Sequence, residues 1–215
     1  MWKSAIAYAV LISATVHANG ATVPIEPDSF AAGTDLRGAF PGVTLSVEGK
    51  VGVEVRAVNG FSPFNGRNLA TTGSLVFGQF PFASTEVPQG WDEGLGLLRV
   101  DFSRPVDFVK IDLIYDDNDV AALKAFDRYG NFLASFVASG DGRGPTLYSV
   151  ASITRPTADI AYVLAGGIGG EAIFLDNLQV NAAPIPEPPM IALYGIGLAL
   201  ISRPLRKPGF TQRTD

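Results

Sequence analysis

Four consecutive residues with oxygen-bearing side chains, Asp116-Asp117-Asn118-Asp119, follow an apolar alternating segment and suit a hard cation. Calcium takes six to eight oxygen ligands, largely carboxylates and carbonyls from flexible loops. Asp176, near the end of another apolar segment, would add a further carboxylate. We therefore treat Asp116, Asp117, Asp119 and Asp176 as candidate ligands of a structural calcium ion. The alternative is a solvated turn, because Asp and Asn favour turns and no Asp-x-Asp-x-Asp-Gly loop is present.

A second group of chemically capable residues is Trp91-Asp92-Glu93. Two carboxylates about 5 to 10 Å apart can hydrolyse a glycosidic bond, and an aromatic ring beside them can stack on a sugar. Neighbouring residues in a strand point to opposite faces, however, which makes Asp92 and Glu93 a poor pair. The competing expectations are a loop tip with a partly buried tryptophan, and a sugar-binding platform that joins Trp91 with Tyr129 or Tyr148.

Histidine and cysteine are nearly absent from the chain. His17 is the one histidine and there is no cysteine, so removal of the N-terminal segment would leave neither. A Ser-His-Asp triad, a Cys-His dyad, a histidine zinc site and a disulfide framework are then excluded. The glycine-rich run 166–170 lacks the lysine and helix of a phosphate loop, and we interpret it as a hairpin loop. We expect no enzyme and no cofactor other than the structural calcium.

The charge of the chain body is acidic. Residues 19–189 contain 11 basic and 20 acidic side chains. A nucleic-acid-binding surface needs a positive footprint, so nucleic acid is not an expected partner. Hydrophobic residues make up 47% of the 215 residues and charged residues 17%, which is enough apolar material for a folded core.

Apolar and polar residues alternate with period two along most of the body, as in strands with one buried face. The clearest examples are residues 51–56, 98–102 and 109–115. Other candidate strands are 43–48, 74–80, 121–127, 131–138, 148–154, 160–165 and 172–180. Asn-Gly and Gly-rich turns separate them, and no segment predicts a helix of three turns. The sequence predicts an all-β domain over residues 19–181, a two-sheet antiparallel β-sandwich of the jelly-roll or lectin-like kind.

The N-terminus has the order of a secretory signal. Lys3 precedes an apolar run from Ala5 to Val16, and Val16-His17-Ala18 offers the side chains that a signal peptidase reads. Residues 1–18 are therefore predicted to be a signal peptide that is cleaved after Ala18.

The C-terminus has three successive parts. Pro186-Glu187-Pro188 ends a Pro-rich linker over residues 182–189, an apolar run follows from Met190 to Ile201, and Arg203, Arg206 and Lys207 come next. A 12-residue helix spans about 18 Å, whereas a bilayer core of about 30 Å needs roughly 20 residues. Residues 190–207 are thus a short transmembrane or sorting segment. Its basic residues stop transfer on the cytoplasmic side, with a tail to residue 215.

This layout resembles the PEP-CTERM sorting signal of Gram-negative bacteria, in which a Pro-Glu-Pro motif, a short apolar segment and a basic cluster end the chain. The resemblance implies that an exosortase in the inner membrane recognises Pro186, Glu187 and Pro188. It also implies release into the outer envelope or the extracellular matrix, and an association with exopolysaccharide and biofilm. A plain membrane anchor that stays in the mature protein is the alternative.

The body resembles jelly-roll domains of envelope proteins. The stretches PDSFAAGTDLRGAFPGVTLSV, PVDFVKIDLIYDDNDVAALKAFDRYGNFLAS and AIFLDNLQV carry this resemblance, and carbohydrate-binding modules share the pattern. It implies a non-catalytic structural, adhesive or carbohydrate-binding module. The alternative function is a secreted glycan-active hydrolase that uses a carboxylate pair.

Overall fold

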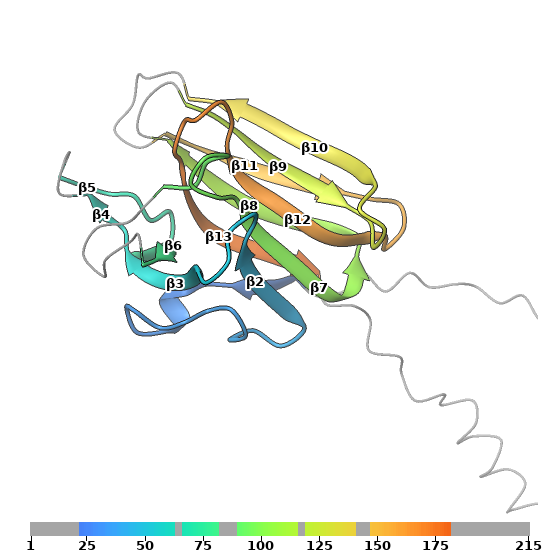
Figure 1. Ribbon diagram of the computed structural model, residues 1–215, viewed down its shortest axis with the longest axis horizontal. Helices are drawn as coiled ribbons and strands as arrows, with labels where there is room; N and C mark the ends of the chain where they lie inside the picture. The colour runs from blue at the N-terminus through green and yellow to red at the C-terminus, as the bar shows by residue number, and fades with distance from the viewer. Residues whose placement is uncertain (1–21, 63–65, 82–89, 116–118, 141–146, 182–215) are drawn as a thin grey trace, which may run out of the picture. The chain divides into compact units, whose positions relative to one another are not determined.

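The computed structural model describes residues 22–62, 66–81, 90–115, 119–140 and 147–181, which form two facing β-sheets (Figure 1). The one helical element described is a short 3₁₀ turn, η1 (Pro27–Ser29). The strands are β1 (Thr22–Ile25), β2 (Val43–Val47), β3 (Glu54–Asn59), β4 (Phe61–Ser62), β5 (Arg67–Asn68), β6 (Leu75–Phe80), β7 (Leu98–Val106), β8 (Phe108–Tyr115), β9 (Val120–Phe126), β10 (Phe132–Ser139), β11 (Leu147–Thr154), β12 (Ile160–Gly167) and β13 (Phe174–Asn181).

Every strand pairing between these elements is antiparallel. One sheet has six strands in the order β11-β8-β13-β6-β3, with β1 also paired to β13. The other has five strands in the order β10-β9-β12-β7-β2, and β4 and β5 form a separate two-stranded ribbon. The predicted all-β, two-sheet antiparallel sandwich is confirmed.

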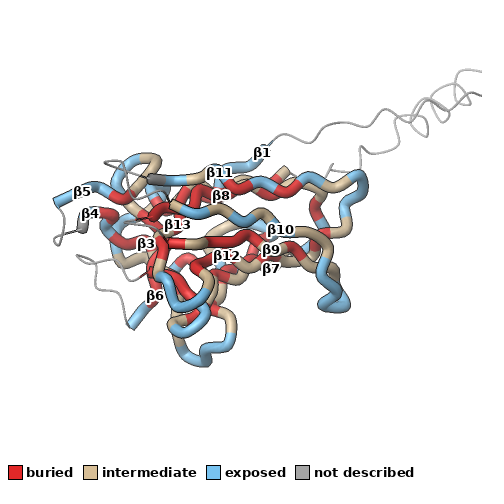
Figure 2. The backbone as a smooth tube through the Cα atoms, turned by 90° about the horizontal axis from the view of Figure 1, so that it is seen from above, coloured by how far each residue is buried: buried red, intermediate tan, exposed pale blue. Residues whose placement is uncertain are grey.

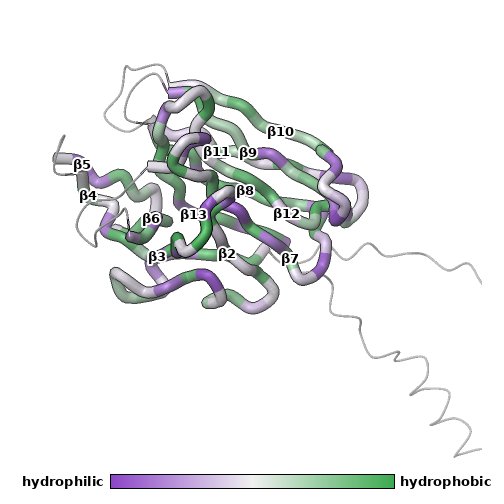
Figure 3. Tube along the Cα trace, viewed as in Figure 1, coloured by the Kyte–Doolittle hydropathy of each residue, from purple (hydrophilic) through white to green (hydrophobic). Residues whose placement is uncertain are grey.

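The core lies between the two sheets because each strand alternates inward apolar and outward polar residues. In β7, Leu98 and Val100 are buried, whereas Arg99 and Asp101 face outward. Figure 2 shows the buried segments along the facing sides of the two layers. Figure 3 shows the same strands as mostly apolar and the connecting turns as polar.

Two details of the predicted strands are wrong. The alternation at 51–56 begins too early, because β3 starts at Glu54 and Val51 is fully exposed, beside Gly52 at φ +78°. Left-handed backbone favours glycine and does not continue a strand. The run 166–170 is not a hairpin loop, because β12 and β13 belong to different sheets. The run instead crosses from one sheet to the other.

The segments with the sorting and export predictions lie outside the described residues. They include Ala18, the Pro186-Glu187-Pro188 motif, the apolar run 190–201, and Arg203, Arg206 and Lys207. Among the residues that are described, no helix has the length and apolar character needed to span a membrane.

Candidate functional site

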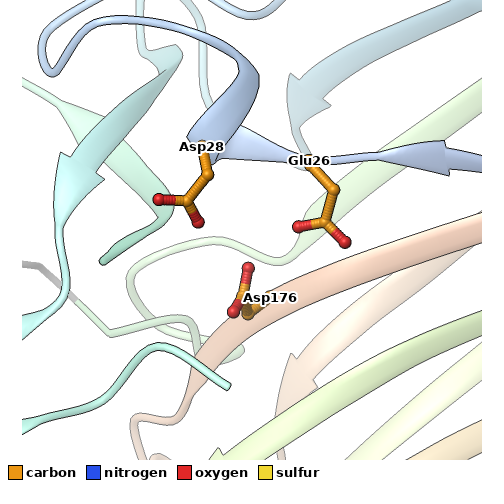
Figure 4. Close-up of side chains that lie close together, drawn as sticks. All are labelled: Glu26, Asp28 and Asp176. Atoms are coloured by element: carbon orange, nitrogen blue, oxygen red, sulfur yellow. The ribbon is translucent and has the colours of Figure 1, made fainter. Parts of the chain in front are cut away.

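Three carboxylates lie close together at the point along β13 where its neighbouring strand changes from β6 to β1. β1 pairs with the second half of β13, from Ile25 opposite Leu178 onward, while β6 meets β13 at Leu175. Asp176 lies between these two contacts. Glu26 follows β1 directly and Asp28 lies in η1, so the end of β1 delivers both residues to Asp176 (Figure 4). We call Glu26, Asp28 and Asp176 the acidic cluster; one ligand oxygen of each lies within 4.8 Å of the others.

A bulge in β13 shapes this place. The register of β13 against β8 shifts between Asp176 and Gln179, and Asn177 has φ +50°. Asn tolerates the left-handed region better than most residues because its short side chain bonds locally. Here the side-chain amide of Asn177 donates a 3.0 Å hydrogen bond from Nδ2 to Oδ2 of Asp112 on β8. The bulge interrupts the regular pairing at Asp176.

The loop before β6 holds one oxygen of each carboxylate in the acidic cluster. The amides of Thr71 and Thr72 donate to Oδ2 of Asp176 at 2.8 and 2.9 Å. The Thr72 hydroxyl lies 2.9 Å from Oε2 of Glu26. Oδ1 of Asp28 accepts the amides of Ser74 and Leu75 at 2.8 and 3.1 Å. Residues 71–75 therefore fix the positions of all three carboxylates.

Burial disfavours ionisation of two members of the acidic cluster, Glu26 and Asp176. Burial, together with the charges of Asp176, Asp28 and Asp112, raises the pKa of Glu26 to about 7 in spite of the hydrogen bond from Thr72. Burial also raises the pKa of Asp176, although hydrogen bonds from Thr72 and Thr71 oppose this. Among the described ion pairs, none joins a lysine or arginine to these three carboxylates. The cluster is thus a concentration of acidic groups without a basic counter-ion in the part of the chain that the structure describes.

Of the four predicted calcium ligands, the structure describes Asp119 and Asp176. Asp116 and Asp117 lie outside the described residues. Asp119 is buried at the start of β9, where its carbonyl accepts the Gly140 amide. Asp176 instead joins Glu26 and Asp28. The β1–β13 pairing, which was not predicted, brings Glu26 and Asp28 to Asp176. A calcium site that includes Asp116, Asp117 and Asp119 stays a prediction.

Trp91 cannot serve as a sugar platform in this fold. Its side chain is 0% exposed, and its indole N–H donates a 2.8 Å hydrogen bond to the carbonyl of Phe77. The neighbouring carboxylates have separate partners. Asp92 Oδ1 accepts the amides of Gly94 and Leu95, which closes a turn, and Glu93 lies 3.6 Å from the Lys124 ammonium. This stretch therefore serves packing and loop geometry.

Tyr129 and Tyr148 are both exposed but lie at opposite ends of the sandwich. Tyr148 pairs with Ile114 near the end of β8, the end at which β9 begins. Tyr129 lies in the turn after β9, where Asp127 Oδ1 accepts the amides of Tyr129 and Asn131. The two rings are separated by the length of β9 and cannot bind one sugar ring together.

A surface hollow adjoins Tyr129, which is 74% exposed. We call this feature the Tyr129 hollow; it is lined by Pro105, Asp127, Arg128, Tyr129, Ala158 and Asp159. Arg128 lies over the Tyr129 ring at 4.8 Å, and Arg155 holds Asp159 through two hydrogen bonds of 3.0 and 2.8 Å. The hollow thus combines one aromatic ring with fixed polar groups of both charges.

A row of aromatic side chains runs from the Tyr129 hollow across the outer face of the five-stranded sheet. Tyr162, Phe126 and Phe132 are consecutive cross-strand partners on β12, β9 and β10. Tyr162 and Phe126 stack at 4.9 Å, and Phe126 meets Phe132 edge-on at 5.9 Å. The Tyr162 hydroxyl lies beside Gly130, 3.8 Å from where a Cβ would stand. We call Tyr162, Phe126 and Phe132 the aromatic row.

Sequence reasoning missed Glu26, Asp28 and the aromatic row for different reasons. Glu26 and Asp28 lie in the stretch IEPDS, where two acids two residues apart around a proline resemble an ordinary turn. The row becomes visible only with strand register, because Phe126, Phe132 and Tyr162 are one to several strands apart along the chain. Alternation within each strand does signal that Tyr162 and Phe126 face outward, opposite the buried Val163 and Ala125.

Comparison with known proteins gives a likeness of fold. No family model matches any part of the chain, the Pro-Glu-Pro motif included, and no curated protein matches it. The K2 cleaved adhesin domain of Lys-gingipain is 15% identical with a TM-score of 0.47, covering 75% of this chain and 100% of that domain. The CBM22-1 xylan-binding domain of Xyn10C from Paenibacillus barcinonensis is 11% identical with a TM-score of 0.42, covering 76% and 97%.

A third solved structure, TmCBM61 in complex with β-1,4-galactotriose, is 16% identical with a TM-score of 0.36 and covers 67% of this chain and 90% of that one. The chain is a β-sandwich similar to adhesin and carbohydrate-binding-module domains. Sandwiches host many roles, so function has to be argued from the residues of this chain.

Proposed function

We propose that this chain is an exported, non-catalytic module of a Gram-negative cell envelope or extracellular matrix. In this proposal, signal peptidase removes residues 1–18. An exosortase then recognises Pro186, Glu187 and Pro188 while residues 190–207 hold the chain in the inner membrane. The three-part order of the C-terminus and the N-terminal signal support the sorting part of the proposal.

The mature sandwich, in this proposal, binds exopolysaccharide at the Tyr129 hollow and the adjoining aromatic row. The single observation that carries this part is the highly exposed ring of Tyr129 beside fixed polar side chains in a hollow. Sugar rings offer apolar C–H faces that pack on aromatic rings and hydroxyls that bond to fixed polar groups, and binding sites combine both kinds of contact.

The alternative of a glycan-active hydrolase finds less support in the geometry. Its candidate carboxylates, Asp92 and Glu93, cap a turn and pair with Lys124, respectively. In the Tyr129 hollow, Asp127 binds its own turn and Asp159 binds Arg155. These carboxylates have lowered pKa values, chiefly through the Asn131 and Arg155 side chains, whereas a general acid needs a raised one.

Affinity gel electrophoresis of the full chain against exopolysaccharide extracted from a biofilm-forming Gram-negative culture tests the binding part. We expect retardation of the wild type, and a loss of about tenfold or more in affinity for Tyr129→Ala. Tyr148→Ala is the matched control, because it removes another exposed tyrosine ring, 51% exposed, at the far end of the sandwich. Equal loss in both variants, or no retardation of the wild type, would contradict a binding site at Tyr129.

A further inference from the structure

The acidic cluster has features that ordinary folding does not explain. Asp176 is 0% exposed, and its Oδ1 atom is buried without a hydrogen-bond partner in the described part of the chain. Asp112, 2% exposed on the neighbouring strand, likewise has an Oδ1 without a partner there. Burying a carboxylate oxygen without a donor or a counter-charge is strongly destabilising. Both orphaned atoms lie on the β8–β13 pair beside Glu26 and Asp28.

Hydrogen-bond donors contact only one of the two oxygens of each carboxylate in the acidic cluster, among the residues described. Residues 71–75 donate to Oδ2 of Asp176, Oε2 of Glu26 and Oδ1 of Asp28. The structure gives no donor, among the described residues, to the other oxygen of each of these carboxylates. Figure 4 shows the Asp176 carboxylate pointing from β13 toward the space between Glu26 and Asp28. One oxygen each of Glu26, which joins β1 to η1, of Asp28 in η1 and of Asp176 in β13 is thus left for a ligand that accepts electron pairs.

We infer that Glu26, Asp28 and Asp176 bind a calcium ion that ties β1 and η1 to β13. Two ligands of one calcium ion, each about 2.3–2.6 Å from it, are at most about 5.2 Å apart, and one carboxylate oxygen of each cluster residue lies within 4.8 Å of the others. The Thr71 hydroxyl lies 2.7 Å from Oδ2 of Asp112 and 3.1 Å from Oδ2 of Asp176. It therefore connects Asp112 to the acidic cluster through hydrogen bonds.

The chemistry of the ligands selects calcium among common cations. The described residues include neither histidine nor cysteine, the ligands that zinc and copper prefer. Magnesium usually keeps several waters and takes only one or two protein carboxylates, whereas calcium accepts many carboxylate oxygens in irregular arrangements. Three convergent carboxylates therefore fit calcium best. The expected affinity is that of extracellular modules, about 10⁻⁴–10⁻³ M.

The test is calorimetric titration of the full chain with calcium chloride after treatment with a chelator, together with thermal unfolding. We expect one ion per chain and a rise in Tm of about 5 °C or more at saturating calcium. Glu26→Gln and Asp28→Asn should each weaken calcium affinity about tenfold or more. Glu93→Gln is the matched control, since it removes an exposed carboxylate that pairs with Lys124 on the other sheet, and it should bind as the wild type does.

Each remaining outcome overturns the inference. If the variants fold poorly, the titration of the wild type still tests the inference. Absence of binding heat and of any rise in Tm at 10 mM calcium would mean that the acidic cluster binds protons instead of an ion. Unchanged calcium affinity in both Glu26→Gln and Asp28→Asn would place any bound ion elsewhere. An equal affinity and an equal rise in Tm with magnesium chloride would contradict the inference that the site selects calcium.

Discussion

Ile25 lies opposite Leu178 in the antiparallel register of β1 on β13, and this one pairing brings Glu26 and Asp28 to Asp176, 150 residues further along the chain. Both residues of the pair are buried in the main hydrophobic core. The packing of β1 and the assembly of the acidic cluster therefore depend on the same contact. A short N-terminal strand that burial does not hold would leave Glu26 and Asp28 without a fixed position.

Ile25→Ala tests how strongly this strand is held. Ile25 is 1% exposed, and truncation of a buried isoleucine costs about 2–5 kcal/mol, so we expect Tm to fall by roughly 5 °C or more. Val23→Ala is the control on the same strand, because Val23 is 42% exposed and should change stability by about 0.5 kcal/mol or less. Similar losses in the two variants, measured by chemical denaturation, would mean that β1 is held by backbone pairing alone.

The calcium-free protein should lose stability as pH rises through the range in which Glu26 ionises. The pKa of Glu26 rises from its ordinary 4.5 to about 7 in the folded chain, chiefly because of burial. The folded state therefore holds this proton more tightly than the unfolded state does, and the resulting stabilisation is complete below about pH 4.5 and lost as pH rises toward 7. The raised pKa of Asp176 acts in the same direction.

Thermal unfolding in excess chelator between pH 5 and 7.5 measures this effect. We expect a falling Tm for the wild type and a flatter profile for Glu26→Gln, which carries no titrating proton at that position. Identical slopes in the two proteins would assign the pH dependence to other groups and would remove Glu26 as its main source.

The fluorescence of Trp91 should be that of a side chain buried away from water. The chain contains two tryptophans, Trp2 and Trp91, so cleavage after Ala18 would leave Trp91 alone. Because its side chain is 0% exposed, we expect blue-shifted fluorescence that acrylamide quenches poorly and that added polysaccharide leaves unchanged. Trp91→Phe removes the indole donor from the Phe77 carbonyl and should cost about 1–3 kcal/mol. A red-shifted, easily quenched emission would mean that Trp91 is exposed to solvent, and Trp91 would again be a candidate for sugar binding.

Alternation along the sequence predicted most strands because each central strand buries one face. The segments 98–102 and 109–115 lie within β7 and β8, and the turn at Tyr129-Gly130-Asn131 joins β9 to β10, with Gly130 at φ +81°. The ribbon strands β4 and β5 escaped prediction because they have two residues each and carry no periodicity. The strand β1 escaped because three of its four residues are exposed.

The site could be predicted only in part. The sequence identified Asp176 among the candidate calcium ligands, as a carboxylate that could complete the shell of the acidic turn, and the structure shows that it is buried. Its partners depend on which strand lies beside β13, and strand order is a property of long-range pairing that no local pattern encodes. The same holds for Tyr162 and Phe126, which become neighbours only through the register of β12 on β9.

The ends of the mature protein are the subject of the last prediction. In a host that contains an exosortase, we expect intact mass analysis to give a product that begins near Asn19 and ends near Pro186-Glu187-Pro188, because the proposed export and sorting signals lie in those two segments. Glu187→Ala should leave the N-terminal cleavage unchanged and cause the form that extends to Asp215 to accumulate. Glu171→Ala is a suitable control, since it removes a glutamate from a loop of the sandwich. A wild-type product that retains residues through Asp215 in the presence of the exosortase would contradict sorting, and residues 190–207 would then act as a permanent anchor.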